Sequence, residues 1–275
     1  MIDAALATEL AGLRPDLHRY CARLVGSAID GEDVVQDAIA KALAALPTDA
    51  PTALRPWLFR VAHNVAIDHL RRYERRHVDG GVELDALDVE LAVARDPAVV
   101  RASLARFLAV PTRQRAAIIL KDVLGLALDE IAATLAMTVP AVKAALVRGR
   151  AALADAADLP VAVDAAERAQ LERYAALFNA RDWDGLRALL SEQCQLDLVA
   201  KATRRGPAVR EYYGRYAGEQ VRVEVGVVDG RAVLLAFEGD GAAPAYYIAL
   251  GWRDGQVETI RDWRYARYVA EPIAL

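Results

Sequence analysis

The stretch from Trp57 to Arg76, WLFRVAHNVAIDHLRRYERR, is the feature that most constrains what this chain can fold into. It contains neither glycine nor proline, so it predicts one uninterrupted helix of about five turns at 3.6 residues each. The apolar residues that would face a core are Leu58, Val61, Ala62 and Val65. A neighbouring stripe carries Trp57, Arg60, Asn64, Arg71 and Arg75. Aromatic, amide and guanidinium groups in one line bind unstacked bases beside phosphates, although a solvated basic helix end has the same composition.

Charge is unevenly distributed along the 275 residues, whose net charge is −4. Residues 57–77 hold five arginines against two acids, and residues 111–153 hold six basic residues against three acids. Between them, residues 78–100 hold six acids against one arginine. Two basic segments therefore flank an acidic one, and the negative total does not exclude a nucleic-acid partner.

The two cysteines, Cys21 and Cys194, are far apart and form no CxxC or Cys/His cluster. We therefore expect no metal, no cofactor and no disulfide, with each cysteine a small core residue in a reducing compartment. The first residues, MIDAALATELAGL, lack the pattern of a signal peptide, and no apolar run reaches membrane-spanning length. We expect a soluble, cytoplasmic protein.

A second helix is predicted from Glu32 to Leu46, after a break at Asp30-Gly31. Its outer face is a polar strip that includes Asp33, Gln36, Asp37 and Lys41. A proline-containing loop from Pro47 to Pro56 then leads to Trp57. The order EDVVQDAIAKAL, loop and WLFRVAHNVAIDHLRR resembles the core domain of extracytoplasmic-function (ECF) sigma factors of the sigma-70 family.

The resemblance implies a role for each of these features in residues 1–77. The strip of Asp33, Gln36, Asp37 and Lys41 would dock on bacterial RNA polymerase core. The loop would hold a flipped base of the promoter −10 element, and the helix from Trp57 would melt the duplex. The residues expected at DNA are Trp57, Arg60, Asn64, Arg71, Arg72, Arg75 and Arg76. The acidic linker, residues 78–104, would thread the polymerase cleft, although a merely solvated tether has the same composition.

Residues 105–157 predict a helix-turn-helix, with LDEIAATL and VPAVKAALVRGRAAL as its two helices. The segment PTRQRAAIILKDVLGLALDEIAATL resembles the promoter-reading domain of the same family, which implies binding to the −35 element. Its candidate DNA-binding residues are Arg115, Lys143, Arg148 and Arg150. The exposed side of the second helix is otherwise rich in alanine, which donates no hydrogen bond to a base. We therefore predict weak base readout, with phosphate and shape contacts supplying most of the affinity.

Residues 165–275 change character, with most of the aromatic residues and with alternating β-branched segments. Helices are predicted first, then strands at Cys194–Ala200, Val221–Val228, Ala232–Glu238, Ala245–Arg253 and Val257–Arg264. Asp229-Gly230 and Asp254-Gly255 predict hairpin turns. This α+β layout, with FNARDWDGLRALLSEQCQLDLV, resembles the SnoaL-like cone of cyclases and ketosteroid isomerases. The expected fold is thus multidomain: two all-α sigma domains, a helical bundle and a helix-turn-helix, followed by an α+β cone.

Such a cone can enclose a pocket, for which the candidate lining residues are Asp197, Tyr212, Trp252 and Asp262. No catalytic constellation is recognisable among them, and aromatic residues in strands are usually core. We therefore expect a sigma factor that is no enzyme, whose cone regulates it and could hold a small-molecule ligand. Two alternatives stay open: a DNA-targeted or vestigial SnoaL-like enzyme, and a plain helix-turn-helix repressor that acts without polymerase.

Overall fold

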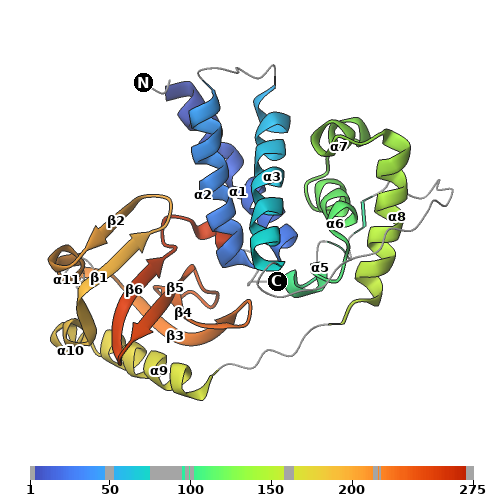
Figure 1. The fold of residues 1–275 in the computed structure, drawn as a ribbon. Coiled ribbons are helices and arrows are strands. Elements are labelled where there is room, and N and C mark those ends of the chain that lie inside the picture. The colour runs from blue at the N-terminus through green and yellow to red at the C-terminus, as the bar shows by residue number, and fades with distance from the viewer. Residues whose placement is uncertain are drawn as a thin grey trace. The chain divides into compact units, whose positions relative to one another are not determined.

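The computed structural model describes residues 4–46, 53–74, 95–96, 99, 102–157, 164–212, 216 and 218–270. The chain divides into two compact units, Met1–Pro160 and Val161–Leu275 (Figure 1). Both predicted halves of the sigma region, the helical bundle and the helix-turn-helix, therefore belong to the first unit.

The first unit opens with three helices that pack against one another: α1 (Ala4–Val25), α2 (Ala28–Ala45) and α3 (Leu54–Glu74) (Figure 1). Their shared core includes the fully buried side chains of Leu17, Tyr20, Val35, Leu58 and Phe59. Because α3 begins at Leu54, the last residues of the predicted loop form its first turn, where a proline is tolerated. Residues 47–52 of that loop lie outside the described part of the chain.

The predicted break at Asp30-Gly31 is wrong, because α2 runs through both residues. The turn lies earlier, at Gly26, whose φ of +75° favours glycine. Ser27 then caps α2 by accepting a 3.1 Å hydrogen bond from a backbone N–H of the first turn. Gly31 serves packing: a Cβ atom there would lie 2.5 Å from the Cα atom of Ala22 in α1.

The second half of this unit contains α5 (Leu104–Phe107), α6 (Thr112–Ile118), the π-helical segment η1 (Ile119–Val123), α7 (Leu128–Leu135) and α8 (Val139–Asp155). Here α7 and α8 are the predicted helix-turn-helix pair; α7 has the expected bounds, and α8 ends two residues later than expected. Ala136 makes the turn in a left-handed conformation, and Thr138 caps α8 through its hydroxyl group.

One hydrophobic core continues through both halves of the first unit, from Leu17 in α1 to Leu146 in α8. Helix α1 contacts α5, α6 and η1, and α3 contacts α7. The end of the acidic linker also attaches here, because Arg95 donates hydrogen bonds to the carbonyl oxygens of Asp122 and Val123. Residues 75–94, which include most of that linker, lie outside the described residues.

The second unit joins a six-stranded sheet to the helices α9 (Ala165–Asn179), α10 (Trp183–Leu189) and α11 (Pro207–Tyr212). The strands are β1 (Leu190–Leu198), β2 (Ala202–Arg205), β3 (Val221–Val228), β4 (Arg231–Glu238), β5 (Tyr246–Arg253) and β6 (Gln256–Asp262). Their order is β2-β1-β6-β5-β4-β3, with β1 and β6 parallel and the other pairs antiparallel. Helices α9, α10 and α11 pack against this sheet, which is the expected α+β cone.

Both predicted hairpin turns of the sheet are confirmed, since positive φ angles occur at Asp229, Gly230, Asp254 and Gly255. Strand β2 was not predicted from the sequence, because its four residues are mostly exposed and carry no alternating pattern.

The outer edge of the sheet is closed by side chains from the end of α9. The side-chain amide of Asn179 donates to the carbonyl oxygen of Val223 and accepts from its N–H, at 2.8 and 2.9 Å. Arg181 donates to the carbonyl oxygens of Glu219 and Val221. Part of the main chain of β3 is therefore paired on both sides.

Candidate nucleic-acid interface

Helix α3 has the two faces that its sequence predicts. Leu58, Ala62 and Val65 are buried and Val61 is half-buried, so this side packs into the core. Burying such aliphatic side chains stabilises the fold by roughly 1.5–3 kcal/mol each. Phe59, which was not assigned to that side, is also fully buried, edge-on to Tyr20 with their ring centroids 5.7 Å apart.

The residues of α3 expected at DNA fall into three groups. Arg60, Asn64, Arg71 and Arg72 are exposed. Trp57 is half-buried and packs partly against the core, so less of its ring is available for stacking than the sequence indicates. Arg75 and Arg76 lie outside the described residues. Of the residues expected at DNA, the described part of α3 thus presents three guanidinium groups and one amide to solvent.

Arg60 is already engaged within the first unit. Its Nη2 atom donates a 2.7 Å hydrogen bond to the main-chain carbonyl oxygen of Ala133, in the first helix of the helix-turn-helix. The two halves of the sigma region therefore meet at a residue that the sequence assigns to DNA. This hydrogen bond uses one of the five N–H donors of the guanidinium.

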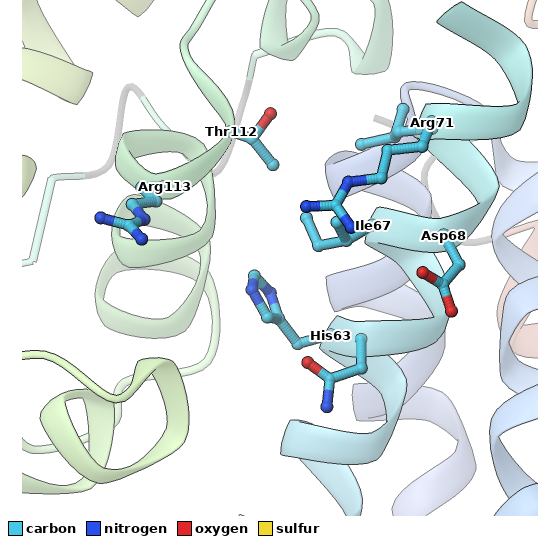
Figure 2. A pocket seen from close by; sticks show the side chains of 8 residues that line it. His63, Ile67, Asp68, Arg71, Thr112 and Arg113 are labelled. Carbon is cyan, nitrogen blue, oxygen red and sulfur yellow. The ribbon is translucent and has the colours of Figure 1, made fainter. Parts of the chain in front are cut away.

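A pocket of about 460 Å³ opens between α3 and α6 (Figure 2). Its lining residues are His63, Asn64, Ile67, Asp68, Leu70, Arg71, Thr112 and Arg113. The first six belong to α3 and the last two to α6. Figure 2 shows the side chains of His63 and Arg71 extending from α3 toward α6, whereas Asp68 points to the other side of α3.

His63 is a neutral member of this pocket. The hydroxyl group of Tyr20 lies 2.7 Å from its Nδ1 atom. Burial, and next the positive charge of Arg113, lower the pKa of His63 to about 4. Burial also raises the pKa of Tyr20, so that its hydroxyl group stays protonated. The sequence does not reveal this pair, because 43 residues separate the two side chains.

The expectation that Arg115 contacts DNA needs correction. Its side chain is buried, and its guanidinium donates hydrogen bonds to the carbonyl oxygens of Val110, Leu108 and Leu24. Since Leu24 belongs to α1, Arg115 joins the two halves of the first unit. Arg115 is therefore structural in this arrangement.

The remaining candidates of the helix-turn-helix lie on α8 and differ in availability. Lys143 and Arg148 are half-buried. Arg150 forms an ion pair with the fully buried Asp122, with 2.6 Å between Nη2 and Oδ1 and a second hydrogen bond from Nε at 3.1 Å. This pair has a structural role that the sequence did not reveal, because the partners are 28 residues apart.

The strip expected to dock on polymerase lies on the outer side of α2. Asp37 and Lys41 are exposed, and Asp33 and Gln36 are half-buried. Glu32, one turn earlier, is fully buried and paired with Arg14 of α1. The available strip therefore begins at Asp33.

In the second unit, the interior of the cone is almost filled. The cavity measures about 10 Å³ and is lined by aromatic and aliphatic side chains together with Tyr212 and Asp262. Asp262 accepts a 2.8 Å hydrogen bond from the hydroxyl group of Tyr216 and a 2.9 Å bond from the N–H of Arg264. Burial raises the pKa of Asp262 above its usual value. These hydrogen bonds and the charge of Arg264 offset only part of that rise.

The other two pocket candidates do not line this cavity. Asp197 lies beside Arg261, 3.6 Å from its Nε atom, and alternates in β1 with the buried Leu196 and Leu198. The indole N–H of Trp252 is buried and has no hydrogen-bond partner among the residues that the structure describes. The prediction of one pocket shared by all four residues is therefore wrong for Asp197 and Trp252, because the alternation of β1 places Asp197 on the opposite face from Leu196.

Two further features concern metals and membranes. Within the described ranges, no three His, Cys, Asp or Glu side chains lie close enough together to hold a metal ion. No single helix in the same ranges is long and apolar enough to cross a membrane, and α7 with α8 meets that criterion only as a pair bent by 95°.

Comparison with known proteins identifies the family. Residues 11–76 match Sigma-70 region 2, and residues 104–153 match Sigma-70, region 4. The ECF RNA polymerase sigma factor SigG of Mycobacterium tuberculosis is 30% identical over 273 residues, covering 85% of this chain and 71% of that protein. The ECF RNA polymerase sigma factor SigW of Bacillus subtilis is 31% identical over 150 residues, covering 50% of this chain and 80% of that protein. The chain belongs to the ECF family of RNA polymerase sigma factors.

Among solved structures, the chain is similar to the extracytoplasmic function sigma factor SigJ of Mycobacterium tuberculosis. That alignment covers 97% of this chain and 99% of the other, with 23% identity and a TM-score of 0.38.

Proposed function

We propose that the protein directs RNA polymerase to promoters through two separate surfaces of its first unit. The strip from Asp33 to Lys41 on α2 docks on the polymerase core. The exposed residues of α3 bind and separate the −10 element. The observation that carries this proposal is the exposure of Arg60, Asn64 and Arg71 on a helix whose other side is locked into the core, which supports a rigid cationic surface for a single strand.

For the −35 element, we propose that α8 contributes mainly phosphate contacts. Lys143 and Arg148 are its remaining basic candidates, since Arg150 is engaged by Asp122. The neighbouring alanines can contact a thymine methyl group but donate no hydrogen bond to a base edge. Affinity at this element should therefore depend strongly on salt and weakly on sequence.

Promoter-specific transcription with purified core polymerase tests this function directly. Asp37→Lys should weaken core binding, because it reverses an exposed charge in the docking strip. Asp129→Lys is the matched control, since it reverses an exposed charge on α7. Equal loss of core binding in both variants would contradict docking through α2, and no transcription with any core polymerase and promoter tried would overturn the function itself.

We propose that the second unit regulates the factor and performs no catalysis. Its cavity of about 10 Å³ has room for at most a single water molecule, so an organic ligand would require Tyr212 and its neighbours to move. Asp262, the carboxylate that lines this cavity, is held by Tyr216 and Arg264. A tethered unit acts at high effective concentration, so that a weak contact can change the activity of the attached factor.

Removal of residues 161–275 tests this regulatory role. The first unit has its own core, so residues 1–160 should fold and bind the polymerase core. Transcription by this fragment should differ from that of the whole chain, and equal activity would contradict regulation. Turnover of a small molecule by the whole chain would instead favour the alternative that the second unit is a SnoaL-like enzyme. Because polymerase and promoters are cytoplasmic, the proposed function places the protein in the cytoplasm.

A further inference from the structure

The end of the acidic linker is held by the last residues of η1. Arg95 donates hydrogen bonds from Nε to the carbonyl oxygen of Asp122, at 3.0 Å, and from Nη2 to that of Val123, at 2.6 Å. These are the last two carbonyl oxygens of η1, and a helix end leaves such groups without partners of its own. The positive guanidinium also suits the negative end of the helix dipole. Arg95 therefore caps η1 from a position 27 residues earlier in the chain.

A second contact ties the next residue of the linker to the side chain of Asp122. The main-chain N–H of Asp96 donates a 3.0 Å hydrogen bond to Oδ1 of this fully buried carboxylate. The same carboxylate accepts two hydrogen bonds from Arg150 in α8, at 2.6 and 3.1 Å. One carboxylate thus joins the linker to the helix that the proposed function assigns to the −35 element. We call the contacts of Arg95 and Asp96 with Asp122 and Val123 the linker clamp.

The partners in the linker clamp lie in η1 and α8, so the clamp moves with the second half of the sigma region. A factor bound to both promoter elements must separate its two halves. The −10 and −35 elements are about 25 base pairs apart, which is about 85 Å along straight B-DNA. Arg60 of α3 is instead bonded directly to α7, and the adjoining α8 is only about 25 Å long. Once the halves separate, the linker is the covalent connection between them.

Chain length leaves this connection little slack. Twenty residues, 75–94, lie between the end of α3 and Arg95. A fully extended chain across them reaches about 75 Å, which is less than the distance between the two elements. The next described residue of the linker, Val99, is buried in the core. Opening the clamp therefore frees residues 95–98, which adds up to about 14 Å of reach, or about four base pairs of DNA.

We infer that the linker clamp sets the longest spacing between the −10 and −35 elements that the factor accepts. Arg95 and Asp122 thereby act as positioning residues, because they act through the linker and α8 and need not touch DNA. The effect on spacing rests on the proposed function, whereas the clamp itself does not.

Transcription with core polymerase tests the effect on spacing, with one promoter whose spacer is lengthened by one to four base pairs. At two added base pairs, Arg95→Ala should keep at least about fivefold more of its optimal activity than the wild type, because the longer tether reaches both elements. Arg106→Ala is the matched control. It removes a guanidinium bond of 2.6 Å to the carbonyl oxygen of Leu153 in the same half of the sigma region and leaves the clamp in place. Its dependence on spacer length should match that of the wild type.

A compensating deletion separates the length of the linker from other effects of Arg95. Removal of residues 80–82, Gly-Gly-Val, changes no charge and shortens the linker by about 10 Å. In the wild type, this deletion should make the factor lose activity at shorter spacers than before. Combined with Arg95→Ala, it should restore a dependence on spacer length close to that of the wild type. A purely structural role of Arg95 predicts no such compensation.

Hydrogen exchange of the Asp96 amide in the free, full-length protein tests the clamp without polymerase. This amide should exchange at least about tenfold faster in Arg95→Ala than in the wild type or in Arg106→Ala. Arg95 is exposed, so its replacement should leave the chain folded, which urea unfolding checks. Unchanged exchange, or the same dependence on spacer length in Arg95→Ala and the wild type, would overturn the inference. A wild type inactive at every spacer, with a protected Asp96 amide, would overturn the proposed function and with it the role in spacing, while the clamp would stand.

Discussion

The guanidinium group of Arg60 on α3 donates a hydrogen bond of 2.7 Å to the main-chain carbonyl oxygen of Ala133, 73 residues further along the chain. One half of the sigma region thus holds a residue of the other half that the proposed function assigns to DNA. This bond, the buried guanidinium of Arg115 and the shared hydrophobic core make the two halves one compact unit. Under the proposed function, Arg60 therefore serves both promoter DNA and a contact inside the protein.

Replacing Arg60 by alanine should destabilise the first unit modestly. The charged hydrogen bond to Ala133 is exposed, so its loss should cost about 1 kcal/mol of unfolding free energy. Arg72→Ala should cost less than about 0.5 kcal/mol, because the hydrogen bond of Arg72 within the described part of the chain is to the carbonyl oxygen of Asp68 in its own helix. Urea unfolding followed by circular dichroism measures both. Equal stability of the two variants would mean that the Arg60 bond contributes nothing.

Gly31→Ala should be strongly destabilising, because the added Cβ would lie 2.5 Å from the Cα atom of Ala22 and would push α1 and α2 apart. We expect a loss of about 2 kcal/mol or more. Gly12→Ala is the control, since beyond the adjacent backbone of α1 no atom of the described residues lies within 4 Å of a Cβ placed there. That change should stabilise the protein by roughly 0.5–1 kcal/mol. Thermal unfolding midpoints that move in the same direction would contradict the close approach of α1 and α2.

The stability of the first unit should fall in mild acid because of His63. Its pKa is about 4 in the folded protein and near 6.5 when unfolded, so the unfolded chain binds the proton more readily. The stabilisation is complete above pH 6.5 and is lost as the pH falls toward 4. Between pH 7.5 and 5, the expected loss is about 2 kcal/mol.

The control for this pH effect is His63→Gln, which cannot gain a proton. Urea unfolding of wild type and variant at both pH values isolates the contribution of His63, since other titrating groups are common to both. An identical pH dependence in the two proteins would show that His63 is not shielded as its burial beside Tyr20 indicates.

Arg150→Ala should cost about 3 kcal/mol, because it leaves the fully buried carboxylate of Asp122 without its ion-pair partner. Arg19→Ala removes the more exposed pair with Asp16 and should cost less than about 0.5 kcal/mol. Chemical denaturation of both variants compares the two costs. If Arg150→Ala has the same unfolding free energy as the wild type and weakens only DNA binding, Arg150 acts as a DNA contact and not as a structural residue.

The elements of the fold were largely predictable from local pattern. The period of apolar residues located α3, α7 and α8, and β-branched alternation located β3. The start of α2 was misplaced because Gly31 serves packing against Ala22, which a local reading mistakes for a break. Strand β2 was missed because its exposed residues carry no alternation.

The candidate site was predictable only where exposure follows from helical period. Arg60, Asn64 and Arg71 are exposed as the stripe on α3 predicts. The burial of Arg115 and the ion pair of Arg150 were missed because their partners, the carbonyl oxygen of Leu24 and the carboxylate of Asp122, are distant in sequence. The pocket beside α3 was missed for the same reason, since α6 supplies Thr112 and Arg113 to a wall that no segment forms alone.

The amide of Asn179 occupies both main-chain groups of Val223 at the outer edge of the sheet. An exposed strand edge is where nascent or partly folded chains add to one another and start aggregates. With this position already taken, and with Arg181 on the carbonyl oxygens of Glu219 and Val221, β3 offers a poor template for such growth. The second unit is therefore protected, along this edge, against the addition of a strand from another copy of the chain.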